Sequence, residues 1–247
     1  AVHRFFFNTA QTIEVFAFGA GTIGGTMIDQ IRDQHDKLLK ENVDVKVMAI
    51  TTIDGMNLSE EGLDLSSWRE DMKNPMFKFG PENVDDIINF VKKNKPLNPV
   101  FVDCTASYDL PDRYLDILNA GMSIATPNKR ANSKSMDFYR KLRSTANKMH
   151  RRFLYETNVG AGLPIIDTLQ NLFKSGDRLE SFNGIMSGSL SYIFGKLDEG
   201  VPFSKAVLEA KELRYTEPDP RDDLNGMDVA RKGLIIAREA GFDIELD

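Results

Sequence analysis

The sequence is poor in residues that bind metals or form crosslinks: its 247 residues include one cysteine and three histidines. The single cysteine, Cys104, excludes an internal disulfide and fits a reducing compartment, so we expect a cytoplasmic protein. The histidines are scattered and, with one cysteine, give no zinc-ligand spacing. No apolar run approaches the roughly 20 residues that a membrane-spanning helix needs, and no signal peptide opens the sequence.

The net charge of the sequence limits the kinds of molecule that it is expected to bind. Lysine and arginine total 31, aspartate and glutamate total 37, and the formal net charge is −6. This balance argues against a nucleic-acid-binding surface. The absence of a G-x-x-x-x-G-K-[ST] motif argues against a P-loop kinase or ATPase. The sequence starts without methionine and stops shortly after a predicted helix, so we expect part of a longer polypeptide whose C-terminal remainder is absent.

Strand and helix patterns alternate along the first part of the sequence. An apolar run at 13–18 and an alternating stretch at 43–51 flank a segment with helical spacing at 26–39, which predicts a βαβ unit with a right-handed crossover. Residues 52–80 show no regular pattern. Alternating strands and helices predict an α/β fold, a Rossmann-type parallel sheet covered on both faces. Further helices are expected at 81–93 and 112–119, and further strands at 100–104 and 123–125.

The pattern changes after Lys129, where helices dominate. We expect a dinucleotide-binding domain at 1–155 and an α+β substrate-binding and dimerisation domain at 156–247. One strand of a second sheet is expected at 179–183. The other expected elements are a short strand at 153–155 and helices at 133–150, 163–173, 187–197, 203–213 and 227–240.

Three glycines, Gly19, Gly21 and Gly24, lie between the first strand and the first helix. This is the context in which the G-x-G-x-x-G pattern binds a dinucleotide. Gly19 permits the tight turn, Gly21 lets the backbone approach a pyrophosphate, and Gly24 lets the helix pack closely on the strand. The helix N-terminus offers N–H groups and its positive dipole end to the phosphates. We therefore predict cofactor contacts along this loop, including Thr22 and Ile23.

The end of the second strand distinguishes NAD from NADP sites. An NAD-selective site usually places a carboxylate there, which holds the ribose hydroxyls. This sequence has Thr51 and Thr52 at that place, and the nearest carboxylate, Asp54, lies slightly beyond the expected position. Nothing there clearly repels a 2′-phosphate, and no arginine clearly binds one. We therefore expect NADP, or both cofactors, with Thr51 and Thr52 as contacts.

Two further strands end in polar residues. Ligands of a parallel sheet lie beyond the carboxyl ends of its strands. This places Thr105 near the nicotinamide and makes Lys129 a candidate cofactor or substrate contact. Cys104 has two interpretations, a small buried residue or the nucleophile of a semialdehyde dehydrogenase. The first is favoured, because Cys104 lies in an apolar strand without a nearby histidine to activate it.

The tract at 216–232 places a carboxylate-rich turn directly before a helix. Asp228 and Lys232 are four residues apart and therefore share one helical face. Two prolines and a glycine fix the loop that carries Glu217 and Asp222. A lysine fixed beside carboxylates can hold a small zwitterion and move a proton. The alternative is a solvated acidic loop followed by an ordinary surface ion pair.

These motifs, in this order, resemble homoserine dehydrogenase, and specifically the dehydrogenase portion of bifunctional aspartokinase–homoserine dehydrogenases. The resemblance spans nearly the whole sequence. The bifunctional assignment rests on Phe7-Asn-Thr, Ile13-Glu-Val-Phe and Thr157-Asn158. The other matching pieces are Gly19–Gly24, Asp103–Thr105, Thr126–Lys129, Tyr155–Pro164, Gly184–Phe194 and Thr216–Lys232.

The resemblance implies reversible, NAD(P)H-dependent reduction of L-aspartate 4-semialdehyde to L-homoserine, a step in threonine, methionine and isoleucine biosynthesis. It implies that Lys232 donates and accepts the proton at the substrate oxygen and that Asp228 binds substrate beside it. It also implies that Glu217 and Asp222 bind the amino group of the substrate and its surroundings. Lys129 is similar to a family contact with cofactor or substrate.

Four residues are similar to the family's monovalent-cation site, in which Glu156 and backbone carbonyls near Val159, Ala161 and Leu163 would bind sodium. The resemblance further implies a homodimer or higher homo-oligomer, fused to an aspartokinase. One departure is Arg214, where the family commonly has glycine, and we expect an altered backbone contact to cofactor or substrate there. The alternative function is a non-catalytic dinucleotide-binding domain that regulates or assembles a bifunctional kinase polypeptide.

Overall fold

The computed structural model describes residues 10–216 and 219–246, except for the side chain of Asp222. The chain divides into two compact units. Unit 1 comprises Ala1–Ala131 and Asp137–Tyr155, and unit 2 comprises Asn132–Met136 and Glu156–Asp247. None of the helices described combines the length and the apolarity that crossing a membrane requires.

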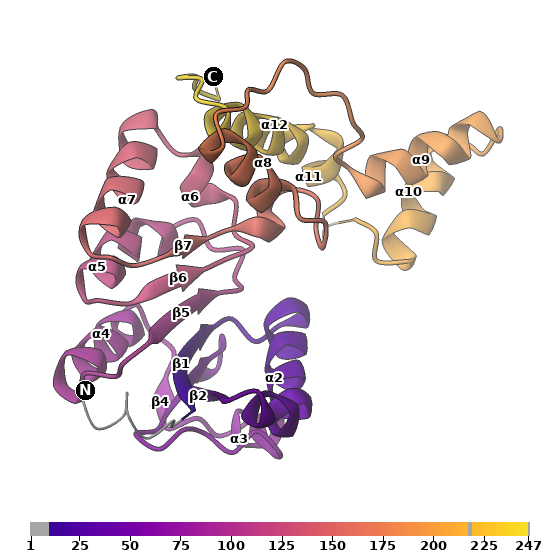
Figure 1. The fold of residues 1–247 in the computed structure, drawn as a ribbon. Coiled ribbons are helices and arrows are strands. Elements are labelled where there is room, and N and C mark those ends of the chain that lie inside the picture. The colour runs from indigo at the N-terminus through magenta and orange to yellow at the C-terminus, as the bar shows by residue number, and fades with distance from the viewer. Residues whose placement is uncertain (1–9, 217–218, 247) are drawn as a thin grey trace. The chain divides into compact units, whose positions relative to one another are not determined.

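Unit 1 is built on a seven-stranded sheet with the strand order β4-β3-β2-β1-β5-β6-β7 (Figure 1). Strands β2, β1, β5, β6 and β7 run parallel to one another. At one edge of the sheet, β3 pairs antiparallel with both β2 and β4. The predicted α/β fold with a parallel sheet is therefore confirmed. The strands are β1 (Gln11–Phe18), β2 (Val43–Thr51), β3 (Gly55–Leu58), β4 (Phe77–Lys78), β5 (Pro99–Asp103), β6 (Ser123–Ala125) and β7 (Phe153–Leu154).

Side chains of β1 alternate between two apolar clusters, as the period of two along a strand requires. Phe16 and Phe18 belong to the cluster under α4, α5 and α7. Val15 and Ala17 belong to the cluster under α2 and α3. The sheet is thus covered on both faces. The covering elements are α2 (Thr22–Lys40), α3 (Trp68–Asp71), α4 (Glu82–Asn94), η1 (Leu110–Arg113), α5 (Tyr114–Asn119), α6 (Arg130–Ser133) and α7 (Met136–Lys148).

The segment at 52–80, expected to be irregular, contains β3, α3 and β4 instead. Gly55 allows the hairpin, because its φ is +154° and a Cβ there would lie 2.1 Å from the carbonyl oxygen of Phe77. The Asn57 side chain accepts a hydrogen bond from the backbone N–H of Met76 at 2.7 Å. These elements are too short to show a sequence period, and tertiary contacts define them.

The single helix expected at 133–150 is wrong, because α6 ends at Ser133 and α7 begins at Met136. The cause lies in unit 2, where the buried guanidinium of Arg238 donates to the carbonyl oxygens of Asn132 and Lys134, at 2.9 and 2.7 Å. The N–H of Met136 also donates to the Glu245 carboxylate at 2.8 Å. Backbone groups that a continuous helix would use internally are therefore bound to side chains.

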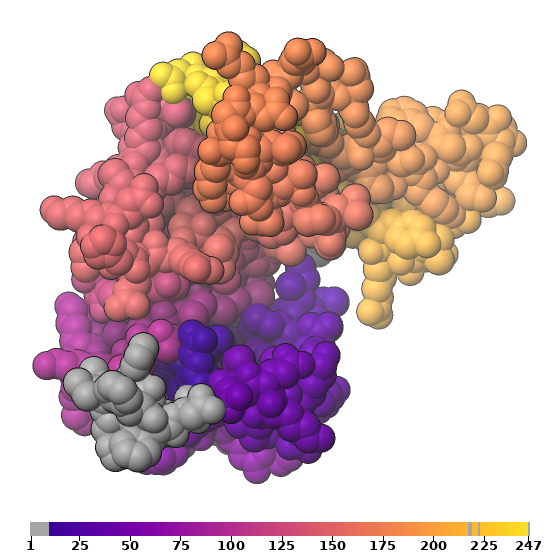
Figure 2. Space-filling model, in the orientation of Figure 1, coloured from indigo at the N-terminus to yellow at the C-terminus, as the bar shows by residue number. Residues whose placement is uncertain are grey.

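Unit 2 is helical in its described part. Helices α9 and α10 contact each other through Ile193, Ala206 and Ala210. Within the unit, this pair projects away from α8 and α12 (Figure 1) and forms the orange lobe at the right of Figure 2. The elements of unit 2 are η2 (Glu156–Asn158), α8 (Ile165–Lys174), α9 (Gly188–Asp198), α10 (Phe203–Glu212), α11 (Arg221–Leu224) and α12 (Met227–Glu239).

The strand expected at 179–183 is not formed, and neither is the second sheet of the expected α+β arrangement, within the described residues of unit 2. A strand needs a neighbour that pairs with its N–H and C=O groups. The rest of unit 2, as far as it is described, provides only helices and irregular segments. Residues 179–183 are therefore irregular, without a partner strand in the described part of unit 2.

Candidate active site

The glycine loop between β1 and α2 has the geometry that a dinucleotide requires. Gly19 has a φ of +89°, and its N–H donates to the carbonyl oxygen of Thr51 at 2.8 Å. A Cβ on Gly24 would lie only 1.9 Å from the carbonyl oxygen of Gly19, so no side chain fits there. A Cβ on Gly21 would meet no atom within 4 Å. Gly19 and Gly24 are thus required by the turn, while Gly21 faces open space that a pyrophosphate can approach.

The first turn of α2 fits an anion. It contains no acidic residue, and no side chain caps its N–H groups. Thr22 and Ile23 are exposed there. Uncapped N–H groups and the helix dipole both favour phosphate at this end. The residues present therefore fit the pyrophosphate of an NAD(P) cofactor.

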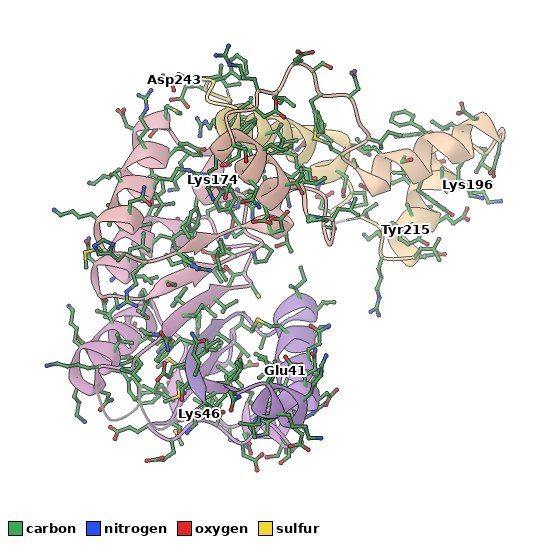
Figure 3. The ribbon with its side chains drawn as sticks, viewed as in Figure 1. Glu41, Lys46, Lys174, Lys196, Tyr215 and Asp243 are labelled. Carbon is green, nitrogen blue, oxygen red and sulfur yellow. The ribbon has the colours of Figure 1, made fainter. Side chains whose placement is uncertain are left out.

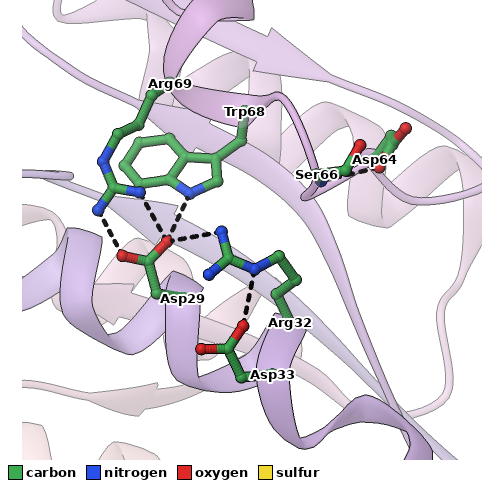
Figure 4. Close-up of polar contacts among 7 residues, drawn as sticks. All are labelled: Asp29, Arg32, Asp33, Asp64, Ser66, Trp68 and Arg69. Atoms are coloured by element: carbon green, nitrogen blue, oxygen red, sulfur yellow. Dashed lines mark hydrogen bonds and ion pairs between the residues drawn. The ribbon is translucent and has the colours of Figure 1, made fainter.

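A polar network fixes α3 against α2 (Figure 4). Asp29 accepts hydrogen bonds from the indole N–H of Trp68 at 3.1 Å and from the guanidinium of Arg69. The paired arginine holds the pKa of the Asp29 carboxyl well below its usual range. A Cβ on Gly25 would lie 3.4 Å from the Trp68 ring. The Trp68 ring thus packs directly on α2 at Gly25.

The two threonines at the end of β2, both predicted as cofactor contacts, differ in the exposure of their side chains. The side chain of Thr51 is buried at 1% exposure, and its hydroxyl has no hydrogen-bond partner. Thr52 is half-buried, and its hydroxyl accepts from the N–H of Asp54 at 3.1 Å. The structure therefore leaves Thr52, but not the hydroxyl of Thr51, accessible to a ligand.

The ends of β5 and β6 are joined by a buried polar cluster around Asp103. Its carboxylate accepts from the Tyr114 hydroxyl at 2.6 Å and from the Asn128 amide at 3.2 Å. Burial raises the pKa of Asp103 even though these hydrogen bonds lower it. Thr126 donates to the backbone oxygen of Asp103 at 2.9 Å. Lys129 is half-buried and follows directly, so this cluster sets the loop that carries it.

Asp103, Tyr114 and Asn128 were not predicted as site residues. A buried carboxylate at a strand end is recognisable from sequence only when the burial of the strand is known. Their shared function in the fold is to hold two strand ends in register. The loops that carry Thr105 and Lys129 both start from this cluster.

Cys104 is a packing residue under the glycine loop. A Cβ on Gly24 would lie 3.1 Å from the Cys104 Cβ. Burial, with a smaller contribution from the neighbouring Asp103 charge, raises the pKa of the Cys104 thiol to about 11. A thiol with such a pKa is a poor nucleophile at neutral pH. The structural interpretation of Cys104 is therefore supported over the nucleophilic one.

Iodoacetamide should alkylate Cys104 slowly in the folded protein. With a pKa of about 11, the thiolate fraction at pH 8 is about 10⁻³, against roughly a quarter for an ordinary cysteine. The rate should be about 100-fold lower than in the urea-unfolded protein and should rise with pH up to that pKa. Mass spectrometry of timed samples measures both rates. Equal rates in the two states would restore Cys104 as a candidate nucleophile.

In unit 2, Asp228 and Lys232 lie on one face of α12, as predicted. The Lys232 ammonium contacts the Asp228 carboxylate at 2.6 Å and donates to the carbonyl oxygen of Met186 at 2.6 Å. The side chain of Lys232 is 17% exposed, which is less than expected for an ordinary surface ion pair. The ammonium is therefore fixed from two sides by groups that leave part of it open.

Helix α9 starts where the sequence predicted it, but the polar side chains at its N-terminus were not predicted as site residues. The Ser187 hydroxyl accepts from the N–H of Leu190 at 3.1 Å and caps the helix. Ser189 donates to the Asp223 carboxylate at 2.8 Å and lies 3.0 Å from the Ser187 hydroxyl. Serine before a helix is a capping signal, so the capping role of Ser187 could have been predicted from the sequence. Glu217 and the side chain of Asp222 lie outside the described residues.

The predicted cation-site residues lie together in unit 2. The two carboxylate oxygens of Glu156 each accept one backbone N–H, from Ile166 and Asp167, both at 2.8 Å. Glu156 thus also caps α8. The Leu163 carbonyl accepts from Ile165 at 2.9 Å. Each of these oxygens can accept a further contact, and the sodium site remains a prediction. The other two members are Val159, which is buried, and Ala161, which has a φ of +51°.

Arg214 occupies a left-handed position, with φ +59°. Its N–H donates to the Lys211 carbonyl at 3.0 Å, and the Tyr215 N–H donates to Ala210 at 2.9 Å. These two bonds are the helix-ending arrangement that favours glycine at this place. A conformational requirement therefore explains the usual glycine without any contact to a ligand.

Replacing Arg214 by glycine should stabilise the protein by about 1 kcal/mol, because glycine avoids the steric cost of the left-handed conformation. Urea unfolding monitored by circular dichroism measures the change. Arg214→Ala is the control, since alanine keeps the Cβ and should give no gain. Equal stability of the two variants would contradict this explanation.

Known proteins share this arrangement. Residues 19–156 match the family described as homoserine dehydrogenase, NAD binding domain, and residues 164–247 match the family described as homoserine dehydrogenase. The bifunctional aspartokinase/homoserine dehydrogenase of Haemophilus influenzae is 47% identical over 246 residues, which cover 100% of this chain and 30% of that protein.

Solved structures of other proteins have a similar fold. A Candida auris protein of unknown function has a TM-score of 0.82 and 36% identity, covering 96% of this chain and 65% of that one. A hyperthermophilic archaeal homoserine dehydrogenase mutant in complex with NADPH has a TM-score of 0.77 and 25% identity, covering 93% and 70%. With an NAD(P)-binding unit 1 and both family matches in order, the chain belongs to the homoserine dehydrogenase family.

Proposed function

We propose that this chain is the dehydrogenase portion of a bifunctional aspartokinase–homoserine dehydrogenase. In this role it interconverts L-aspartate 4-semialdehyde and L-homoserine with NADP or NAD. The observation that carries the proposal is the ammonium of Lys232, held at 2.6 Å by both Asp228 and the Met186 carbonyl. Matches to relatives that contain this activity support it, although the chain spans 30% of the length of the Haemophilus influenzae relative.

The cofactor would be held by unit 1. Gly19, Gly21 and Gly24, with the N–H groups of Thr22 and Ile23, would bind its pyrophosphate. When bound, the nicotinamide supplies or accepts the hydride. The other proposed cofactor contacts are Thr51 through its backbone, Thr52, Thr105 and Lys129.

Lys232 would act on the substrate oxygen. An ammonium near a carbonyl oxygen stabilises the charge that develops during reduction and donates the proton. Asp228 would orient the ammonium through their ion pair and would take part in binding the substrate. Glu217 and Asp222 would bind the substrate ammonium through charge-assisted hydrogen bonds. Lys129 would contact the substrate or the cofactor.

Several properties of the whole protein follow from the same proposal. A sodium ion would be bound by Glu156 with the carbonyls of Val159, Ala161 and Leu163. The protein would be a homodimer or higher homo-oligomer fused to an aspartokinase, with a dinucleotide-binding domain at 1–155 and a substrate domain at 156–247. A single cysteine fits a reducing compartment such as the cytoplasm.

Replacing Thr52 by aspartate should shift the preference from NADP toward NAD by about tenfold, because a carboxylate repels a 2′-phosphate and binds ribose hydroxyls. The ratio of kcat/KM values for the two cofactors measures the shift. Thr52→Asn is the uncharged control of the same size. The same ratio in both variants would remove Thr52 from the cofactor site. Thr51→Asp is unsuitable, because it would bury a charge.

The decisive test is oxidation of NADPH by the full-length protein in the presence of L-aspartate 4-semialdehyde. We expect turnover that depends on both substrates. Binding of NADPH without turnover would indicate a non-catalytic dinucleotide-binding domain. If the protein instead reduces NADP⁺ with the same semialdehyde, in a reaction that needs phosphate and is blocked by thiol reagents, it is a semialdehyde dehydrogenase that oxidises the aldehyde through Cys104.

A further inference from the structure

Thr105 is held in one orientation from two sides. Its methyl carbon lies 2.8 Å from where a Cβ on Gly19 would be, so the methyl group packs on the glycine loop. Its hydroxyl donates to the Asp103 carboxylate at 2.6 Å, and its backbone N–H donates to the same oxygen at 2.7 Å. The residue is half-buried and follows β5 directly. Both groups on its Cβ are therefore fixed at the edge where the dinucleotide loop lies.

The surroundings of Asp103 determine which way the Thr105 hydroxyl donates. The other carboxylate oxygen of Asp103 accepts from Tyr114 at 2.6 Å and from the Asn128 amide at 3.2 Å. The Asn128 amide and the Thr105 N–H can only donate, so each Asp103 oxygen is an acceptor. Burial and the Asp103 charge raise the pKa of Tyr114, which keeps its hydroxyl protonated. The hydroxyl proton of Thr105 is therefore committed to Asp103.

The oxygen of Thr105 can then only accept further hydrogen bonds. One lone pair accepts the N–H of Ser107 at 3.2 Å. The second lone pair has no partner among the described residues. A nicotinamide carboxamide carries a C=O acceptor and an NH₂ donor, and a hydroxyl in this state can bind only the NH₂.

We propose that Thr105 accepts a hydrogen bond from the carboxamide NH₂ of the nicotinamide, with its polarity set by the buried positioning residue Asp103. This proposal rests on the proposed function, since it requires that Thr105 contact the cofactor. The position of Thr105 in the sheet favours a contact with the nicotinamide end of the cofactor. The adenosine ribose binds at the end of β2, whereas Thr105 follows β5, which lies on the other side of β1.

The test compares NADP⁺ with its 3-acetylpyridine analogue, in which a methyl group replaces the NH₂ and the carbonyl and ribose are unchanged. Calorimetric Kd values are measured for the full-length protein and for Thr105→Val. The valine removes the acceptor and keeps the shape. We expect Thr105→Val to weaken NADP⁺ binding about 5- to 10-fold and to change binding of the analogue by less than about twofold.

Two control variants separate this contact from general damage. Thr105→Ser keeps the hydroxyl and loses only the methyl group, so the ratio of the two Kd values should stay as in the unchanged protein. Tyr114→Phe removes a hydroxyl from the other side of the same carboxylate and should also leave the ratio unchanged. Thermal unfolding of each variant confirms that it is folded.

Equal weakening of both ligands by Thr105→Val would overturn the proposal and assign the hydroxyl to the ribose or to structure alone. Unchanged binding of both would remove Thr105 from the cofactor site. A full-length protein that binds neither ligand would instead refute the proposed function. A protein that binds NADP⁺ but lacks turnover would refute the activity and leave this contact intact.

Discussion

Lys232→Ala in the full-length protein should lower kcat about 10³-fold or more. The variant loses a general acid, which contributes roughly 10²–10⁴-fold, and the positive charge that stabilises the developing oxyanion. Both functions depend on an ammonium that Asp228 and the Met186 carbonyl fix at 2.6 Å. Steady-state kinetics in both directions measures kcat, and fluorescence titration of NADPH should give an unchanged Kd.

The matched control for Lys232 is Lys196→Ala. Lys196 also lies in unit 2 and pairs with a carboxylate, Glu199, at 3.0 Å, but it is on α9 (Figure 3). Its removal should leave kcat within about twofold, because exposed pairs of this kind contribute little. Near-normal turnover of Lys232→Ala would defeat the catalytic assignment, and an equal loss in both variants would indicate non-specific damage.

Arg238→Met should lower the free energy of unfolding of unit 2 by about 3–5 kcal/mol, the usual cost of breaking a buried, hydrogen-bonded charge. The side chain of Arg238 is 0% exposed and pairs with Glu245 at 2.7 Å. It also donates to the carbonyl oxygens of Asn132, Lys134 and Ile244. Methionine fills the volume but leaves those carbonyls without donors, and each buried unpaired acceptor costs about 1–3 kcal/mol.

Urea unfolding with hydrogen exchange at 132–136 and 242–246 measures this loss. Protection of the Met136 N–H should fall, because it is bonded to the Glu245 carboxylate. Arg221→Met is the control: that arginine pairs with Asp219 but its side chain is 87% exposed, and no measurable change in the unfolding midpoint is expected. Equal stability of Arg238→Met and the unchanged protein would contradict the role given to the guanidinium.

Sequence patterns predicted the elements whose burial follows a local period. The β1–α2–β2 unit was recognisable because buried strands read as apolar runs and the glycine loop has a fixed spacing. The helix break between Ser133 and Met136 was not, because Arg238 causes it from about a hundred residues away. The strand expected at 179–183 is not formed, because a strand also depends on a partner that local sequence does not specify.

In the candidate site, too, some features could be predicted from the sequence and others could not. Asp228 and Lys232 could be paired from their spacing alone, because four residues along a helix place them on one face. The Met186 carbonyl that fixes Lys232 comes from a distant segment and has no side-chain signal. Thr51 and Thr52 are adjacent and chemically identical in sequence. Only the packing of β2 shows that one hydroxyl is enclosed and the other is accessible.

The interleaved chain path has a consequence for engineering. Five residues of unit 2, Asn132–Met136, lie in sequence between two parts of unit 1. A fragment cut after Tyr155 would carry this stretch without Arg238, whose guanidinium binds the carbonyls of Asn132 and Lys134. The nucleotide-binding half is therefore not a portable module that ends at a single cut. Chimeras made by exchanging halves should keep residues 132–136 and α12 from the same parent.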